Sequence, residues 1–158
     1  MVDVEEKRNV SETIDEITVP RGDGRDAIKA RERIIRDFYS CWRKLHDEQK
    51  MYNVYLKDFI NIRQVSVVET VEHASKNYLS TLAVLQLDAI LTGAKKVKMV
   101  AADKKSKNQE KFDKMMIMEF YSPGIGRVKL TVGVMRRTHD KIQYCITSLE
   151  PIKQEKHP

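Results

Sequence analysis

Side chains that could act as acids, bases or metal ligands are few in this sequence. It contains four histidines, namely His46, His73, His139 and His157. No two of them have the spacing of a helical zinc site such as HExxH. The glycine-containing segments 22–24 and 124–126 lack the lysine and serine of a phosphate-binding loop and the strand-then-helix order of a dinucleotide site. We therefore expect no metal and no cofactor.

The two cysteines are the candidate nucleophiles. Cys41 and Cys145 lie far apart and have no CxxC spacing, which argues against a disulfide framework and against a zinc knuckle. Cys145 falls in a predicted strand and Cys41 on the flank of a predicted helix. No GxSxG nucleophile elbow is present. We expect both thiols to be reduced and structural.

One histidine, several basic residues and several hydroxyls fit a metal-free cleavage of RNA. That reaction needs a base for the 2′-OH proton, an acid for the leaving oxygen and cations for the phosphorus oxygens. His73 could be the base or the acid. The other candidate catalytic residues, which would supply charge or orient the phosphate, are Lys129, Arg136, Tyr144, Thr147 and Ser148. A structural interpretation stays open for each: His73 can favour a helix dipole, and Arg136 can flank a hairpin turn.

Charge is distributed unevenly along the chain. Residues 1–93 carry 14 Lys and Arg against 16 Asp and Glu, whereas residues 94–158 carry 15 against 7. The C-terminal excess favours a polyanionic partner, of which nucleic acid is the commonest. The candidate nucleic-acid-binding residues are Lys96, Lys98, Lys104, Lys105, Lys107 and Arg137. The alternative is a solvated lysine-rich surface, since lysines also protect exposed strand edges.

The length of 158 residues predicts one domain, and the composition of 41% hydrophobic and 33% charged residues is typical of globular proteins. No apolar stretch approaches 18 residues, and the N-terminus is charged from Asp3. We therefore expect a soluble, cytoplasmic protein without a membrane segment. Residues 1–20 are expected to form a flexible acidic leader and residues 151–158 a polar tail, on either side of an α+β domain over 21–150.

Hydrophobic periodicity predicts helices and two short strands before residue 93. A long amphipathic helix with a basic outer face is expected over roughly 24–48. Two short strands are expected over 53–56 and 59–63. An almost uniformly apolar helix over 78–91 is expected to be the buried one. We predict these core residues: Leu82, Leu85, Ile90, Val132 and Val134.

Between the short strands and the buried helix, Ser66 and Glu69 have the spacing of a capping box. In that pattern Ser66 is the N-cap and Glu69 returns a hydrogen bond to its backbone. The capped helix is expected to run to about Lys76 and to carry His73 away from its apolar stripe.

Beyond Gly93 the apolar period changes to two, which predicts an antiparallel meander. Its strands are expected over 97–101, 112–121, 127–137 and 141–149. The fold predicted is α+β, with N-terminal helices packed on one face of an antiparallel meander sheet of about four strands.

The other face of that sheet should carry Lys129, Thr131 and Met135. Depending on the link before the last strand, either Tyr144 and Ser148 or Cys145 and Thr147 lie beside them. A two-residue link of His139 and Asp140 would place Thr131 opposite Ser148 and Met135 opposite Tyr144.

The order of elements over roughly residues 58–150 resembles phage and mobile-element modules of the barnase, EndoU, colicin and RelE-like superfamily. The segments that carry the resemblance are VETVEHASKNYLSTLAVLQLDAILTGAKKV, a lysine-rich loop, MMIMEF, VKLTVGV and IQYCITSL. They are similar as well to domains associated with large polyvalent proteins of phages and conjugative elements. The resemblance implies an RNase-like fold with site positions at His73, Thr147 and Ser148.

Two functions follow as hypotheses. The first is an RNase-like module of a phage or mobile element that engages RNA or another polyanion through its C-terminal sheet. The alternative is a catalytically inert binding or inhibitor module that docks a host or element protein through the basic face of the long helix. A solvent-facing His73 without a partner, far from Lys129 and Arg136, would favour the inert module.

Overall fold

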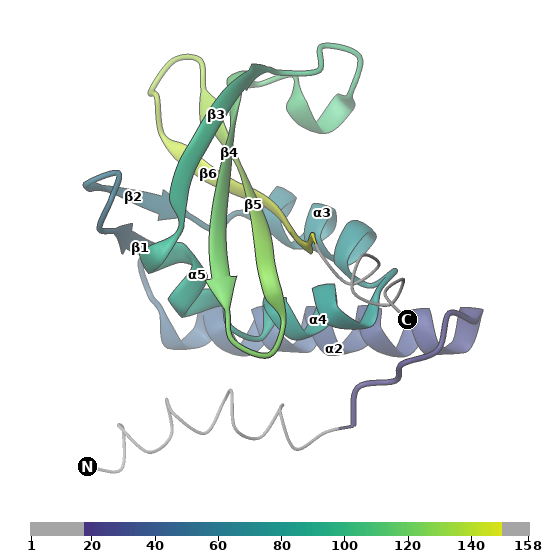
Figure 1. Cartoon of the computed structure of the whole chain (residues 1–158). Coiled ribbons are helices and arrows are strands. Elements are labelled where there is room, and N and C mark those ends of the chain that lie inside the picture. The colour runs from purple at the N-terminus through teal and green to yellow at the C-terminus, as the bar shows by residue number, and fades with distance from the viewer. Residues whose placement is uncertain (1–17, 150–158) are drawn as a thin grey trace, which may run out of the picture.

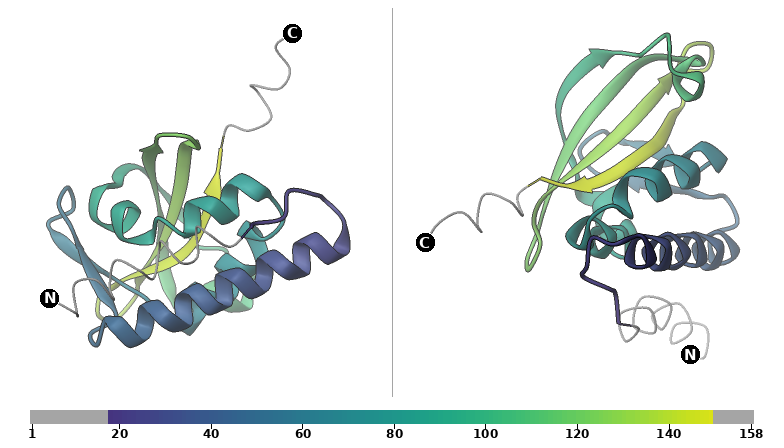
Figure 2. Two further views of the ribbon diagram at one scale, coloured as in Figure 1. Left: turned by 90° about the horizontal axis from the view of Figure 1, so that it is seen from below. Right: turned by 90° about the vertical axis from the view of Figure 1, so that its right-hand side faces the viewer.

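Residues 18–149 are described by a computed structural model, in which a curled sheet packs against helices (Figures 1 and 2). The strands are β1 (Lys50–Asn53), β2 (Asp58–Asn61), β3 (Lys95–Ala101), β4 (Phe112–Ser122), β5 (Gly126–Met135) and β6 (Lys141–Ser148). The helices are α2 (Arg25–Leu45), α3 (Gln64–Ala74), α4 (Tyr78–Val84) and α5 (Leu87–Gly93), with a short 3₁₀ turn η1 (Lys107–Gln109). The fold is therefore α+β as predicted, but the sheet has six strands rather than about four.

The sheet is mixed, with the strand order β1-β2-β6-β5-β4-β3. Strands β3 to β6 form the antiparallel meander that the period of two predicts. Strands β1 and β2 form an antiparallel hairpin, and β2 then pairs in parallel with β6, which lies about 80 residues further along the chain. The strand expected over 53–56 is wrong, because residues 54–57 form the turn of this hairpin. Alternation within a segment indicates which side chains share a face, but it does not indicate which strand lies alongside. An all-antiparallel sheet was therefore the wrong expectation.

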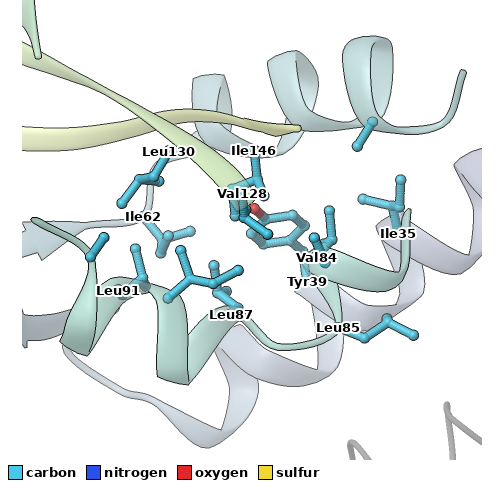
Figure 3. Packing of buried hydrophobic residues seen from close by; sticks show 14 of the residues in the cluster. Ile35, Tyr39, Ile62, Val84, Leu85, Leu87, Leu91, Val128, Leu130 and Ile146 are labelled. Atoms are coloured by element: carbon cyan, nitrogen blue, oxygen red, sulfur yellow. The ribbon is translucent and has the colours of Figure 1, made fainter. Parts of the chain in front are cut away.

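One face of the sheet and the helices α2, α3, α4 and α5 enclose the main core. Figure 3 shows Leu87 and Leu91 from α5 below Val128 and Leu130 of β5, with Tyr39 from α2 beside Val128. Burial of this kind is the dominant favourable term in folding. Four of the five predicted core residues are buried, and Leu82 is half-buried at the margin of the same cluster.

The apolar segment 78–91 forms two short helices rather than one. At Leu85 and Gln86 the backbone N–H groups bond three residues back, to Leu82 and Ala83, and the chain starts a new helix from Gln86. The Gln86 side chain accepts a hydrogen bond from Ser122 Oγ at 2.6 Å, which ties the break to the end of β4. No glycine or proline marks this break, so the pattern of apolar residues predicted a continuous helix.

The fully buried Arg31 fixes the chain that precedes α2. Its guanidinium donates three hydrogen bonds of 2.7 to 2.8 Å, to the backbone oxygens of Pro20, Gly22 and Ser75. Val19 is buried in the main core as well. The end of the expected leader thus packs on the domain, while residues 1–17 and the expected tail lie outside the described residues.

Candidate functional site

A bulge in β6 decides which side chains share the open face of the sheet. Lys129 pairs with Thr147 and Thr131 with Cys145, but Val132 pairs with Gln143, so Tyr144 is the extra residue. Cys145 and Thr147 lie beside Lys129 and Thr131, as in one of the two arrangements left open by the sequence, and Tyr144 from the other arrangement faces the same side. The alternative with Thr131 opposite Ser148 is wrong.

The observed register of β5 and β6 differs from the predicted one because the link between the two strands is longer than two residues. Strand β5 ends at Met135 and β6 begins at Lys141, so five residues form the turn. His139 lies in this turn with a left-handed φ of 64°, and the Met135 N–H donates to the carbonyl of Asp140 at 2.9 Å. Arg136 and Arg137, which the apolar alternation placed in the strand, are exposed turn residues.

A buried polar network positions α3 against the bulge. The Tyr39 hydroxyl donates to Gln143 Oε1 at 2.5 Å, and Gln143 Nε2 donates to Thr70 Oγ1 at 2.8 Å. Ser66 Oγ donates to the backbone oxygen of Gln143, also at 2.5 Å. Burial raises the pKa of the Tyr39 hydroxyl well above its usual range, so it stays a donor. Because buried polar groups need partners, this network fixes the distance between α3 and β6.

A hollow of about 550 Å³ lies between α3, the open face of the sheet and the loop that carries η1; we call it the sheet hollow. Four of the six predicted catalytic residues line it, namely His73, Lys129, Tyr144 and Thr147. Other polar residues of its lining are Glu69, Asp103, Ser106, Gln109, Thr131 and Cys145. Helix α3, strand β5 and strand β6 therefore bring together residues that are far apart in the sequence.

Arg136 and Ser148 do not line the sheet hollow. Arg136 Nε donates to the backbone oxygen of Phe112 at 3.3 Å, on the outside of the turn. Ser148 pairs with Val128, whose side chain belongs to the core, and its backbone N–H donates to Ser80 Oγ at 2.8 Å. Arg136 is thus separated from the other four residues because it lies in the β5–β6 turn. Ser148 is separated from them because its side chain lies on the core face of β6.

Within the sheet hollow, Glu69 and His73 form a carboxylate–imidazole pair. Glu69 Oε1 lies 3.2 Å from His73 Nε2, and Glu69 Oε2 accepts a hydrogen bond from Asn108 of η1. The Glu69 side chain is 11% exposed and the His73 side chain 50% exposed. The carboxylate is therefore buried, while half of the imidazole surface is accessible from outside.

Glu69 is the functional candidate that the sequence interpretation missed. The N-cap of α3 is Arg63, and Ser66 is the third helical residue, whose Oγ accepts from the Arg63 N–H at 2.9 Å. The capping box expected between Ser66 and Glu69 is therefore wrong, and Glu69 is free for the hollow. The sequence signal for its role is the i,i+4 spacing to His73, which places both side chains on one side of a helix.

Two further groups in the hollow are held in their neutral forms. Burial raises the pKa of the Tyr144 hydroxyl, partly offset by Gln109 and Ser106. Burial also raises the pKa of the Cys145 thiol, against smaller opposing effects of Thr131 and Lys129. At neutral pH the hollow thus presents a phenol hydroxyl and a thiol rather than a phenolate and a thiolate.

Gly133 provides the space for the ring of Phe112, which supports Tyr144 in the lining of the sheet hollow. A Cβ at this position would lie 2.5 to 2.6 Å from ring atoms of Phe112, and that ring packs edge-on against Tyr144 with 6.1 Å between centroids. We expect Gly133→Ala to displace Phe112 and to lower the free energy of unfolding by about 1–3 kcal/mol. Urea unfolding and the ring signals of Tyr144 measure both effects. Gly24→Ala is the control, since its Cβ would meet nothing within 4 Å; equal effects of the two variants would contradict the prediction.

The predicted nucleic-acid-binding residues are all exposed but do not form one patch. Lys98 pairs with Ile117 on the open face, whereas Lys96 pairs with Met118 on the core side. Lys104 and Lys105 lie in the loop between β3 and η1. Arg137 lies in the β5–β6 turn, and Lys107 in η1 lines a second hollow described below.

Between residues 18 and 149, no cluster of three or more His, Cys, Asp and Glu side chains has the arrangement of a metal site. Within the same residues, no helix is both long and apolar enough to span a membrane. No protein-family model matches the chain, and neither a curated protein nor a solved structure matches it significantly.

Proposed function

We propose that the chain is an RNase-like module that binds RNA in the sheet hollow and cleaves it without a metal. The observation that supports this most directly is the meeting of His73, Lys129, Tyr144 and Thr147 in one hollow, together with the Glu69 carboxylate. His73 has a partner and shares a hollow with Lys129, which argues against the inert module, whereas its half-exposed side chain and the position of Arg136 outside the hollow do not. The mobile-element origin implied by the resemblance belongs to this proposal.

In the proposed reaction, Glu69 orients the imidazole and His73 takes the proton. A hydrogen bond from His73 Nε2–H to Glu69 leaves the lone pair of Nδ1 to accept the 2′-OH proton. The 2′-oxygen bonds to phosphorus, the bond to the 5′-oxygen breaks, and that oxygen takes a proton from water. Lys129 offsets the charge on the phosphorus oxygens, and the hydroxyl of Thr147 orients them.

The inert binding module stays a second candidate because of a basic hollow on α2. It measures about 430 Å³ and is lined by Arg36, Arg43 and Lys44 with no carboxylate. An acidic protein segment fits this charge. The two candidates use different surfaces, so a variant in one hollow does not disturb the other.

Cleavage of a single-stranded RNA oligonucleotide in EDTA tests the proposed function. The full chain is expected to give products with 2′,3′-cyclic phosphate ends. At the same time, titration of the ¹⁵N-labelled chain with a non-cleavable 2′-O-methyl oligonucleotide should shift the amides of His73, Lys129 and Thr147. Absence of both cleavage and shifts would contradict the proposed function.

Salt dependence tests the lysine-rich loop. If Lys104, Lys105 and Lys107 each contact a phosphate, replacing all three by Gln should reduce the slope of log affinity against log salt by roughly 2, because each contact with a single strand contributes about 0.7. Fluorescence anisotropy with a labelled oligonucleotide at several salt concentrations measures the slope. An unchanged slope would show that these lysines only solvate the loop. Lys57→Gln, in the turn of the β1–β2 hairpin, is the control.

A further inference from the structure

A second hollow lies beside the first, on the other side of η1. It measures about 460 Å³, within the range of about 300–1,000 Å³ typical of small-ligand sites, and we call it the turn hollow. Its lining includes three cations, Arg63, Lys107 and Lys111, and one carboxylate, Glu110. The charge of this hollow is therefore positive on balance, unlike that of the sheet hollow.

The cations of the turn hollow are largely uncompensated. Neither Lys107 nor Lys111 forms an ion pair with any residue that the structure describes. Arg63 lies 3.7 Å from Asp140, but both side chains are about half exposed, so water weakens that pair. Three cations around one hollow are the chemistry that recognises a phosphate group.

The opposite wall of the turn hollow is apolar. It consists of the half-buried Val65 and Met135 over the buried Phe112 and Ile142. A phosphate alone would leave this wall uncovered. A nucleotide would cover it, because its base has an apolar face that packs on aliphatic and thioether side chains while its phosphate reaches the cations.

The two hollows are coupled through η1. Ser106 and Gln109 line the sheet hollow, whereas Lys107 and Asn108 line the turn hollow. Asn108 also donates to Glu69, the carboxylate of the proposed catalytic pair. Consecutive residues of one short turn thus face both sites, so neighbouring nucleotides of one strand can occupy them together.

We propose that the turn hollow is a nucleotide subsite, with the phosphate at Arg63, Lys107 and Lys111 and the base on Val65 and Met135. The inference rests on the proposed function in one respect, namely that the bound nucleotide is part of an RNA strand. A free nucleotide has the same chemistry, and the experiment separates the two sources.

NMR titration of the ¹⁵N-labelled full chain with adenosine 5′-monophosphate at low salt tests the subsite. The nucleotide should shift the amides of Val65, Lys111 and Met135, and it should bind at least about tenfold more tightly than either adenosine or inorganic phosphate, because each of these makes only half of the contacts. Lys111→Gln should lower the affinity about tenfold, and Lys57→Gln should leave it unchanged. Lys111 is exposed, and the spectrum of the free variant shows whether it is folded.

Competition identifies the source. A single-stranded 2′-O-methyl RNA hexamer should displace the nucleotide; failure to do so would overturn the assignment to an RNA strand. Shifts that avoid the turn hollow, or equal affinities of Lys111→Gln and Lys57→Gln, would overturn the subsite itself. These failures differ from failure of the proposed function, which is absence of RNA cleavage and of shifts at His73 and Thr147.

Discussion

Replacing His73 by Ala is expected to lower RNA cleavage by about two to four orders of magnitude. This is the usual contribution of one general acid or base, and His73 is the only histidine among the residues that line the sheet hollow. Removal of the imidazole also leaves Glu69 without the group it orients, although Asn108 still donates to the carboxylate. Initial rates in EDTA, wild type against variant at equal concentration, measure the effect.

Two further variants separate catalysis from folding. Thr147→Val removes a phosphate-orienting hydroxyl at nearly constant volume and should cost less than His73→Ala. Glu69→Gln keeps a hydrogen-bond acceptor for His73 but removes the charge, so it should slow cleavage while binding of a non-cleavable oligonucleotide is retained. Equal turnover by wild type and His73→Ala would remove His73 from the mechanism. Absence of turnover by both would favour the binding module with its basic α2 hollow.

Long amphipathic segments and alternating strands could be predicted from the sequence because their periods are local. The helix expected over 24–48 is α2, at Arg25–Leu45, and the alternation after Gly93 gives β3 to β6 close to their observed bounds. The parallel contact of β2 with β6 depends on residues about 80 positions apart, which no local period encodes. Four-residue strands such as β2 also carry too few alternating residues to define a face.

The sequence predicts which face of the sheet a side chain occupies where alternation within one strand determines it. It does not predict the face where this depends on how two strands are aligned. Lys129 belongs to the open face because Val128 and Leu130 on either side of it are buried. Tyr144 and Thr147 have opposite parity in β6, and both reach the same hollow only because the bulge shifts the pairing by one residue. Tyr144 and Thr147 were candidates for their hydroxyls alone, without a reason for both to face one side.

Glu69 and Arg136 show how a local motif can mislead. The Ser66 and Glu69 spacing fits a capping box, but the N-cap of α3 lies three residues earlier, at Arg63, and Ser66 Oγ accepts from the Arg63 N–H. The apolar alternation of β5 extended the strand to residue 137, yet the chain turns after Met135. Ser66 Oγ instead donates to the backbone of Gln143 in β6. The Arg136 N–H donates to the carbonyl of Lys111 just before β4. In both cases tertiary contacts override a pattern of four to ten residues.

A large loss of stability is expected from a substitution in the buried helix α5. Leu87 is 0% exposed and belongs to the main core, where it lies below Tyr39 of α2 and Val128 of β5 in Figure 3. Leu87→Ala should lower the free energy of unfolding by about 2–5 kcal/mol. The substitution removes buried methyl groups and leaves a cavity, because the surrounding sheet and helices relax only partially. Urea unfolding followed by circular dichroism should show a lower midpoint with an unchanged slope.

Leu82→Ala is the matched control, because it deletes the same atoms from the neighbouring helix α4. Leu82 is only half-buried at the margin of the main core, so part of its side chain is already in water and the cavity is open to solvent. We therefore expect it to cost clearly less than Leu87→Ala. The expected order follows from the different burial of the two side chains. Equal or reversed costs would show that α5 does not pack in the core as described.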